Sequence, residues 1–224
     1  MGKIGEGAFG VVILGQHKYS GVKVAIKAMH KQKINDIFLV NGQSFHEILV
    51  LEECAQTNSP NILELVETFE DSQQLIIVTK FMPAGDLLNY LMKQPVQPLT
   101  EAHARYIITQ VGLGLKGLHE RLIVHRDIKI ENILMSDFSA NAKVRIADLG
   151  SAVKLSAITD TLNFSIGTPG YIAPEILSGQ AYGFACDIWS LGCLLHVLLS
   201  ATTPFWDNDR KERNRKVCQD PLDL

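Results

Sequence analysis

The sequence predicts an α+β fold, in which a small β-rich part is followed by a larger, mostly helical part. From Gly2 to about Lys80, short β-branched or continuous apolar runs such as "GVVILG", "KVAIKAM" and "LIIVTKF" are typical of strands. After the turn sequence "MPAGD" the apolar residues recur at helical spacing. With 224 residues, 46% of them hydrophobic, the chain is long enough for one large domain or two small lobes with a core.

Two helices are expected at defined places. The first interrupts the strands in "SFHEILVLEECAQ", with Ser44 as a candidate N-cap, and the residues that step at helical spacing there are Phe45, Ile48, Leu49 and Glu52. The second is the long segment "TEAHARYIITQVGLGLKGLHE", with Thr100 as its N-cap. Its expected buried face consists of Ile107, Val111, Leu115 and Leu118. Since glycine in a helix costs roughly 1 kcal/mol relative to Ala, we expect close packing at its three glycines, Gly112, Gly114 and Gly117.

Composition excludes several classes of protein. A formal net charge of −3 gives no general attraction for polyanions, so nucleic acid is not an expected partner. The chain opens with no secretory signal pattern, and its longest apolar run, "IWSLGCLLHVLLSA", is too short to span a bilayer and predicts a buried helix. The four cysteines show neither CxxC pairing nor metal spacing, which favours reduced structural thiols. We therefore expect a cytoplasmic protein that does not contact a membrane.

The stretch "KIGEGAFGVV" places Gly5, Gly7 and Gly10 in a G-x-G-x-x-G frame. In a dinucleotide-binding fold a helix follows such glycines at once, and an acidic residue stands about 20 positions further on. Here a second strand, "VVILGQ", follows, and the residue 17 positions after Gly10 is the basic Lys27. The glycines are therefore expected in a β-hairpin, where their missing side chains let backbone amides approach phosphates. The frame by itself is equally compatible with a plain Gly-rich hairpin.

Further motifs follow in a defined order. Lys27 stands in "VAIK", and Glu47 comes 20 positions later on the predicted helix, well placed to hold Lys27 extended. The stretch "HRDIKIEN" at 125–132 places six polar residues between apolar segments, and it is followed by "DLG" at 148–150, "APE" at 173–175 and "DIWSLG" at 187–192. This order and spacing resembles the eukaryotic protein kinases, from residue 2 to residue 224.

The resemblance implies a phosphotransferase that uses ATP and Mg²⁺, in which catalysis is mostly positioning and charge neutralisation. It implies that Asp127 accepts the proton of the substrate hydroxyl and aligns that group. Lys129 is expected on the γ-phosphate, and Lys27, held by Glu47, on the α- and β-phosphates.

The same resemblance assigns further residues of the motifs. Asn132 and Asp148 are expected to hold two Mg²⁺ ions that bridge the phosphates. His125 is expected to pack under Leu149, which replaces the commoner Phe of the magnesium motif. Thr168 is expected to bond within the catalytic loop.

An adenine pocket is also implied. Val12, Ala25 and Leu134 are expected to enclose the adenine, although ordinary core packing explains these three residues equally well outside the kinase frame. Thr79 falls at the gatekeeper position. The remaining pocket residues are Lys80 and Met82, whose backbone atoms are expected at the adenine edge, and Asp86, near the ribose. Lys80 departs from the acidic residue often found there, but only its backbone is needed.

Substrate class follows from the resemblance too. Lys129 after "HRD" and the sequence "GTPGYIAPE" resemble the serine/threonine kinases, and together with "PFWDNDRKERNRKV" they look most like the calmodulin-dependent kinase-like group. The expected partners are protein substrates, bound by a monomer. Asp86 and Glu131 resemble the acidic positions that favour Arg upstream of the target hydroxyl. A solvated acidic rim explains these two residues equally well.

Activation by phosphorylation is not expected to be required. In the family the Arg of "HRD", here Arg126, often meets a phosphorylated residue, but Phe164 stands at that position. Ser165 is the nearest candidate. Val153 and Gln43 stand where related kinases carry further basic partners, so a phosphate would find one Arg and not a cluster.

The expected domain is a single kinase domain, 1–224, with an N-terminal lobe 1–80, a hinge 80–85 and a C-terminal lobe 86–224 that lacks the final helices of the family. Glu175 is then expected to lack its arginine partner, because the arginines at 210, 213 and 215 come too early. A buried carboxylate without its partner costs roughly 3–5 kcal/mol, so we expect this chain to be poorly stable and weakly active. The alternative to an active serine/threonine kinase is therefore a truncated, catalytically weak or inactive binding module. A small-molecule kinase is a more distant alternative, because it would lack "GTPGYIAPE".

Overall fold

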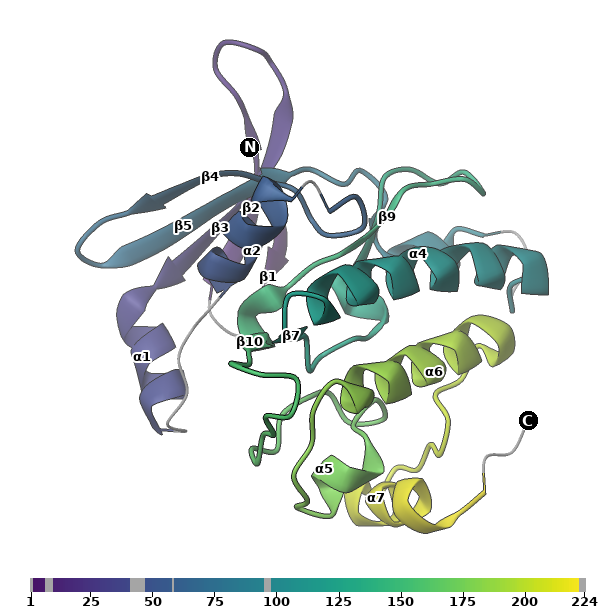
Figure 1. The fold of residues 1–224 in the computed structure, drawn as a ribbon. Helices are drawn as coiled ribbons and strands as arrows, with labels where there is room; N and C mark the ends of the chain where they lie inside the picture. The colour runs from purple at the N-terminus through teal and green to yellow at the C-terminus, as the bar shows by residue number, and fades with distance from the viewer. Residues whose placement is uncertain (1, 7–9, 41–46, 58, 95–97, 222–224) are drawn as a thin grey trace.

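The computed structural model describes residues 2–6, 10–40, 47–57, 59–94 and 98–221. Their N-terminal lobe is built on a five-stranded antiparallel sheet in the order β1-β2-β3-β5-β4. The strands are β1 (Lys3–Glu6), β2 (Gly10–Gln16), β3 (Lys23–His30), β4 (Leu65–Glu70) and β5 (Gln74–Lys80). Figure 1 shows this sheet above the helices of the C-terminal lobe, with one of its helices, α2 (Glu47–Gln56), in front of it. The predicted α+β class is confirmed.

A second helix in the N-terminal lobe was not expected. This helix, α1 (Lys31–Val40), begins directly after β3, where the backbone N–H of Lys31 donates to the carbonyl of Gln73 at 2.9 Å. Ile34 is buried in the main core, whereas Lys31 to Lys33 are only partly covered or exposed. A single buried apolar residue in the first turns is too weak a pattern to predict a helix from periodicity.

Helix α2 turns a different face inward from the one that its apolar spacing indicated. Leu49 is 61% exposed and Glu52 is exposed, so this part of the prediction is wrong. The buried residues of α2 are Glu47, Val50, Leu51 and Cys54. The carboxylate of Glu47 faces Lys27 on the sheet, and this ionic partner sets which face of the helix is covered. Ser44 and Phe45, the proposed cap and first face residue, lie outside the described residues.

The C-terminal lobe combines helices with two small sheets, of order β6-β8-β9 and β10-β7. Its strands are β6 (Gly85–Asp86), β7 (Ile123–Val124), β8 (Ile133–Met135), β9 (Val144–Ile146) and β10 (Val153–Lys154). Its helices are α3 (Leu87–Met92), α4 (Glu101–His119), α5 (Pro174–Leu177), α6 (Ala185–Ser200) and α7 (Arg210–Gln219), with 3₁₀ turns η1 (Ile130–Asn132) and η2 (Leu149–Ser151).

Helices α4 and α6 lie side by side in the middle of the C-terminal lobe (Figure 1). The hydroxyl oxygen of Thr100 accepts the backbone N–H of His103, which confirms the predicted N-cap of α4. The predicted buried face of α4 is also confirmed, because at most 1% of each residue is exposed at Ile107, Val111, Leu115 and Leu118.

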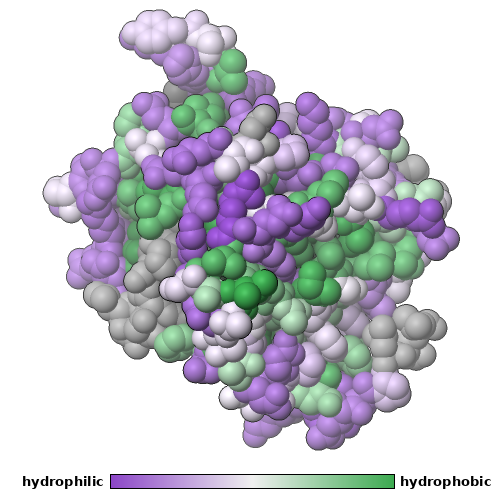
Figure 2. Space-filling model, in the orientation of Figure 1, coloured by the Kyte–Doolittle hydropathy of each residue, from purple (hydrophilic) through white to green (hydrophobic). Residues whose placement is uncertain are grey.

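Helix α6 is covered on one side only. Leu194 and Leu198 belong to the main core, whereas Ile188 is 56% exposed and Leu199 is 39% exposed. Figure 2 shows a group of hydrophobic residues across the middle of the visible face, among hydrophilic residues. Within the described residues, no helix has both the length and the apolar character needed to cross a membrane.

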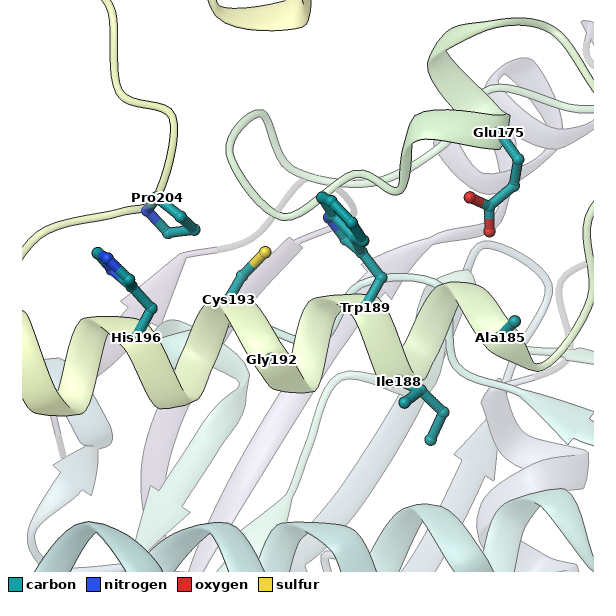
Figure 3. Close-up of a pocket in the computed structure, with 8 residues that line it drawn as sticks. All are labelled: Glu175, Ala185, Ile188, Trp189, Gly192, Cys193, His196 and Pro204. Carbon is teal, nitrogen blue, oxygen red and sulfur yellow. The ribbon is translucent and has the colours of Figure 1, made fainter. Parts of the chain in front are cut away.

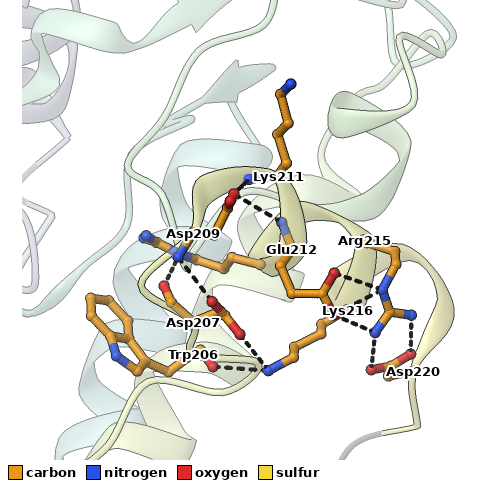
Figure 4. Close-up of polar contacts among 9 residues, drawn as sticks. Trp206, Asp207, Asp209, Lys211, Glu212, Arg215, Lys216 and Asp220 are labelled. Atoms are coloured by element: carbon orange, nitrogen blue, oxygen red, sulfur yellow. Dashed lines mark hydrogen bonds and ion pairs between the residues drawn. The ribbon is translucent and has the colours of Figure 1, made fainter.

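Helix α7 is held by a local network of charges (Figure 4). Asp209 caps its first turn by accepting the N–H groups of Lys211 and Glu212. Arg215 pairs with Glu212 and, at 2.8 Å, with Asp220. The positive charges of this helix are therefore largely compensated within the segment itself.

All four cysteines are free thiols, and three of them, Cys54, Cys186 and Cys193, are buried. Burial raises the pKa of the Cys54 thiol to about 11 and that of Cys193 to about 12. The buried thiols therefore stay protonated and unreactive near neutral pH, as expected for structural cysteines.

The glycines of α4 differ in their surroundings. A Cβ atom on Gly114 would lie 2.8 Å from Cδ1 of Ile146 and 3.0 Å from the carbonyl oxygen of Asn61. A Cβ atom on Gly112 would meet its nearest neighbour, Leu191, only at 3.9 Å, and one on Gly117 would have similar space. Close packing is thus confirmed at Gly114 and wrong at Gly112 and Gly117.

We predict opposite effects of alanine at two of these glycines. Gly112→Ala should stabilise the fold by about 0.5–1 kcal/mol, because alanine favours the helix and has room there. Gly114→Ala should destabilise it by about 1–3 kcal/mol, because the new methyl group overlaps β9 and the segment before β4. Urea unfolding of both variants and the parent checks this. A Gly114→Ala chain as stable as Gly112→Ala would contradict the packing argument.

Candidate active site

Asp127 lies in the loop between β7 and β8, and three groups hold its side chain. Lys129 Nζ lies 2.8 Å from Oδ2, and Asn132 Nδ2 donates to the same oxygen at 3.0 Å. The hydroxyl of Thr168 donates to Oδ1 at 2.7 Å. The 3₁₀ turn η1 brings Asn132 back toward Asp127, whose carbonyl oxygen also accepts from Nδ2, at 2.7 Å. The carboxylate is thus fixed in position while 13% of the Asp127 side chain stays accessible.

Thr168 joins this loop to the segment that precedes α5. Its hydroxyl oxygen accepts from Lys129 Nζ at 2.7 Å while its proton goes to Asp127. The prediction that Thr168 bonds within the catalytic loop is confirmed.

The loop is anchored from below by Asp187, which is fully buried at the start of α6. Its carboxylate accepts the backbone N–H groups of His125 and Arg126, each at 2.8 Å, and lies 2.8 Å from Nε2 of His119. These bonds fix Arg126 at φ 70°, in the left-handed region that residues other than glycine seldom adopt. Such strain persists only where the surrounding contacts determine it. His125 and Leu149 are both buried, which agrees with a packing role for His125.

Lys27 on β3 connects the sheet to the C-terminal lobe. Its Nζ lies 2.8 Å from Oε1 and 2.9 Å from Oε2 of Glu47, and 2.9 Å from Oδ1 of Asp148. The predicted pair of Lys27 with Glu47 is confirmed. Asp148 stands at φ 55°, directly before η2.

The electrostatics of this cluster favour the charged forms of Lys27 and Asp148. Burial works against the charge of Lys27, but Glu47 and Asp148 outweigh it and raise the pKa of Lys27 above its usual range. Burial also works against ionisation of Asp148, but the charge of Lys27 outweighs it and lowers the pKa of Asp148. Burial raises the pKa of Glu47, and its bidentate contact with Lys27 opposes that shift. Lys27 and Asp148 therefore stay ionised throughout the neutral pH range.

Strand β1, which contains Gly5, pairs antiparallel with β2, which begins at Gly10, so the predicted hairpin arrangement of these strands is confirmed. Gly5 pairs with Val12, and a Cβ atom on Gly5 would make only ordinary contacts. A Cβ atom on Gly10 would overlap the carbonyl group of Ala28 on β3. Gly10 is thus required by sheet packing, quite apart from any ligand. Gly7 lies outside the described residues.

The residues predicted for the adenine pocket come from both lobes. Val12 and Ala25 lie on β2 and β3, and Leu134 lies on β8. All three are partly exposed, whereas Ile133 and Met135, which flank Leu134, are buried. This pattern is typical of side chains that line an open site rather than a closed core.

The end of β5 and the segment after it carry the other predicted pocket residues. Thr79 and Met82 are buried, at 8% and 5% exposure. The Lys80 side chain points to Glu64, at 3.1 Å. The Asp86 carboxylate accepts the N–H of Asn89 at 2.8 Å and so caps α3, a structural role that the sequence reasoning did not foresee.

An apolar cavity of about 570 Å³ lies between α6 and the segments around α5 and Pro204 (Figure 3), and Asp127 is not among the residues that line it. Glu175 reaches into this region from α5, toward α6 (Figure 3). No ion pair of Glu175 occurs within the residues that the structure describes. Arg213 stacks over Trp206 at 4.6 Å, and Arg215 binds acidic residues of its own segment, so neither serves Glu175, as expected.

Three functional contacts were missed from the sequence. Asp187 stood in the quoted motif "DIWSLG", which was the one available signal for its anchoring role. The ion pair of Lys154 with Glu53, at 2.6 Å, and the contact of Glu64 with Lys80 join residues whose spacing carries no motif.

Known proteins share this organisation. Residues 1–223 match the protein kinase domain. The chain is 36% identical to calcium-dependent protein kinase 5 of Plasmodium falciparum over 215 residues, which cover 96% of this chain and 36% of that protein. It is 32% identical to serine/threonine-protein kinase ATG1a of Arabidopsis thaliana, covering 97% of this chain and 34% of that protein. It is 34% identical to serine/threonine-protein kinase PLK4 of Xenopus laevis, covering 96% of this chain and 22% of that protein.

The chain therefore spans about a third or less of the length of these relatives, and the match falls on their shared domain. Together with the contacts of Asp127, Lys27 and Asp148, the match over residues 1–223 shows that the chain belongs to the protein kinase domain family.

Proposed function

We propose that this chain is the catalytic domain of a protein serine/threonine kinase, which transfers the γ-phosphate of ATP to hydroxyl groups of protein substrates. The observation that carries the proposal is the side chain of Asp127, held by three partners next to an assembled contact of Lys27 with Glu47 and Asp148. In the transfer, the substrate oxygen bonds to the γ-phosphorus as the bond to the β-phosphate oxygen breaks, and ADP leaves.

In this proposal Asp127 accepts the proton of the attacking hydroxyl. Its two oxygens bond to Thr168, Asn132 and Lys129, so the carboxylate is oriented before the substrate arrives. Lys129, which is 19% exposed, turns its ammonium group toward the γ-phosphate and offsets developing negative charge.

Lys27 is proposed to bind the α- and β-phosphates. Its pKa is raised by its carboxylate neighbours, so it is fully charged when the nucleotide arrives. Glu47 holds it with both oxygens, which limits the loss of side-chain freedom on binding. Gly5, Gly7 and Gly10 are proposed to allow backbone amides close to the phosphates.

Asn132 and Asp148 fit a magnesium site. Amide and carboxylate oxygens are the ligands that Mg²⁺ prefers, and it usually takes only one or two of them together with phosphate oxygens and water. The amide nitrogen of Asn132 is turned to Asp127, which leaves its oxygen for a cation. No cluster of three or more His, Cys, Asp or Glu suited to a metal occurs in the described part of the chain. Bound Mg²⁺ would neutralise the phosphate oxygens during transfer.

The adenine is proposed to lie between Val12 and Ala25 above and Leu134 below, with Thr79 as gatekeeper. The backbone groups of Lys80 and Met82 are proposed to recognise its edge, and residues 80–85 to act as the hinge between lobes 1–80 and 86–224. This arrangement is supported by the partial exposure of Val12, Ala25 and Leu134, which lie on strands of both lobes.

Finer features of the function are proposals of the same kind. The similarity to a calcium-dependent protein kinase supports the calmodulin-dependent kinase-like group, although PLK4 and ATG1a are matched almost as well. A preference for Arg upstream of the target hydroxyl would rest on Glu131, which is exposed, and on the Asp86 oxygen that does not cap α3. A monomer in the cytoplasm is the proposed state.

Asp127→Asn tests the central role. The asparagine keeps the shape of the side chain but cannot accept the hydroxyl proton, so kcat on a generic basic protein should fall about 10²–10⁴-fold. Affinity for ADP should stay within about twofold, because Asp127 is not proposed to bind phosphate. Asp71→Asn, in the exposed turn before β5, is the matched control and should keep full activity. An Asp127→Asn chain with the turnover of the parent would remove Asp127 from the mechanism, and an inactive parent would favour the alternative of a binding module.

Two substitutions of Thr168, one that removes its hydroxyl group and one that keeps it, provide a second test. Thr168→Ala removes the hydroxyl that bridges Asp127 and Lys129, and kcat should fall about tenfold or more, the value of a hydrogen bond to a charged group. Thr168→Ser keeps the hydroxyl and should retain most of the activity. Steady-state kinetics of both variants decide the matter. Equal losses in both would show that the methyl group, and not the hydroxyl, is what counts.

Phosphorylation of Ser165 should not be needed for activity. The segment before it is already anchored, because Leu162 and Tyr182 exchange backbone hydrogen bonds and the Tyr182 hydroxyl donates to the Phe164 carbonyl at 2.7 Å. Arg126 is 5% exposed, and its Nε donates to Ser151. A phosphate would therefore gain one buried cation, and Ser165→Ala should keep about half or more of the parent activity. Loss of nearly all activity with an unchanged circular dichroism spectrum would reverse this conclusion.

A further inference from the structure

The connector between α2 and β4 is bonded to the C-terminal lobe through its backbone. Leu63 donates its N–H to the carbonyl of Ile146 at 2.8 Å, and Ile146 donates to the carbonyl of Asn61 at 2.8 Å. The Asn61 side chain adds bonds to Gln110 on α4 and to the carbonyl of Val144. This connector is therefore fixed to β9 by hydrogen bonds, although it belongs in sequence to the N-terminal lobe.

The next residue, Glu64, connects the same segment to the end of β5. Its carbonyl accepts the backbone N–H of Lys80 at 2.9 Å. Its Oε2 lies 3.1 Å from Lys80 Nζ and 3.6 Å from Nη2 of Arg145 on β9, while Arg145 Nη1 donates to the carbonyl of Ile62 at 2.8 Å. One carboxylate oxygen thus stands between two cations from different lobes. We call Glu64, Lys80 and Arg145 the Glu64 bridge.

The two cations of the Glu64 bridge stand next to the two ends of the proposed nucleotide site. Lys80 is the last residue of β5, two positions before Met82, and Arg145 stands three positions before Asp148. The adenine edge and the magnesium motif are therefore joined through Glu64. Without its charge, the two cations would face one another across the lobes and repel.

The exposure of these residues limits the size of the effect. The side chains of Lys80 and Glu64 are 49% and 51% exposed, whereas that of Arg145 is 12% exposed. Exposed ion pairs add little to global stability and are screened by salt. A contact of this kind is suited to biasing the position of two lobes rather than to holding the fold together.

We propose that Glu64 is a positioning residue for the nucleotide. Its carboxylate holds the hinge strand and β9 at the separation at which adenine and phosphates are bound together, so that it sets the affinity for the nucleotide rather than the rate of transfer. This inference rests on the proposed nucleotide site.

The test compares Glu64→Gln with the parent by calorimetric titration of ADP in the presence of Mg²⁺ and by steady-state kinetics. The glutamine keeps the size of the side chain and removes its charge. The affinity for ADP should fall about two- to fivefold, the range of a partly exposed ion pair, and the KM for ATP should rise by the same factor while kcat stays unchanged. At about 0.5 M salt the difference between variant and parent should disappear, because the charges are then screened.

Two further chains complete the design. Lys80→Met removes the hinge cation and should lower ADP affinity as Glu64→Gln does. The double variant should bind ADP no more weakly than the weaker of the two single variants, because both changes remove the same interaction. Glu101→Gln is the matched control, because Glu101 is 82% exposed and pairs only with Arg105 one turn later on α4, at 3.9 Å. It should bind ADP as the parent does.

Equal ADP affinities of Glu64→Gln, Lys80→Met and the parent would overturn the inference and leave the proposed function intact. A loss of ADP affinity that persists at high salt would also overturn the inference. So would a fall in kcat without any change in ADP affinity or in the KM for ATP. A parent chain that binds no ADP would contradict the proposed nucleotide site, and this inference with it.

Discussion

The geometry of the active site depends on one buried carboxylate, that of Asp187. A charge without contact to water is costly unless several donors surround it. Here the donors are backbone N–H groups of His125 and Arg126, with the His119 ring as a further neighbour. Because those groups belong to the loop that carries Asp127, satisfying the buried charge also fixes the loop on α6. The left-handed backbone of Arg126 is a consequence of the same bonds.

Apolar and ionic contacts both join the two lobes. One hydrophobic cluster includes buried residues of both lobes, among them Leu51 and Leu149, and partly exposed ion pairs such as Lys27 with Asp148 and Glu53 with Lys154 add to it. Such pairs are directional and weak in water, whereas core packing resists any change of volume. The relative position of the lobes is therefore set by shared core packing and adjusted by these ion pairs.

Much of the site could be predicted from the sequence, because its chemistry demands particular residues in a particular order. The contacts of Lys27 with Glu47 and of Thr168 with Asp127 were foreseen in this way. The buried face of α2 was only partly foreseen: Glu47 was expected to meet Lys27, but hydrophobic spacing alone indicated Leu49, which is exposed. The glycines of α4 looked alike in sequence, and only Gly114 has a neighbouring strand within contact distance. Helix α1 and the cap formed by Asp86 likewise depend on tertiary contacts that no local pattern carries.

The side chain of Lys80, the last residue of β5, points away from the side chain of Thr79. Side chains alternate along β5, so the Thr79 side chain points inward at 8% exposure while Lys80 points outward. The Lys80 side chain is thereby available for Glu64. A basic residue is accommodated at this position because the segment before β4 supplies the carboxylate. The charge of Lys80 at the end of β5 is therefore matched by the residue that stands opposite it.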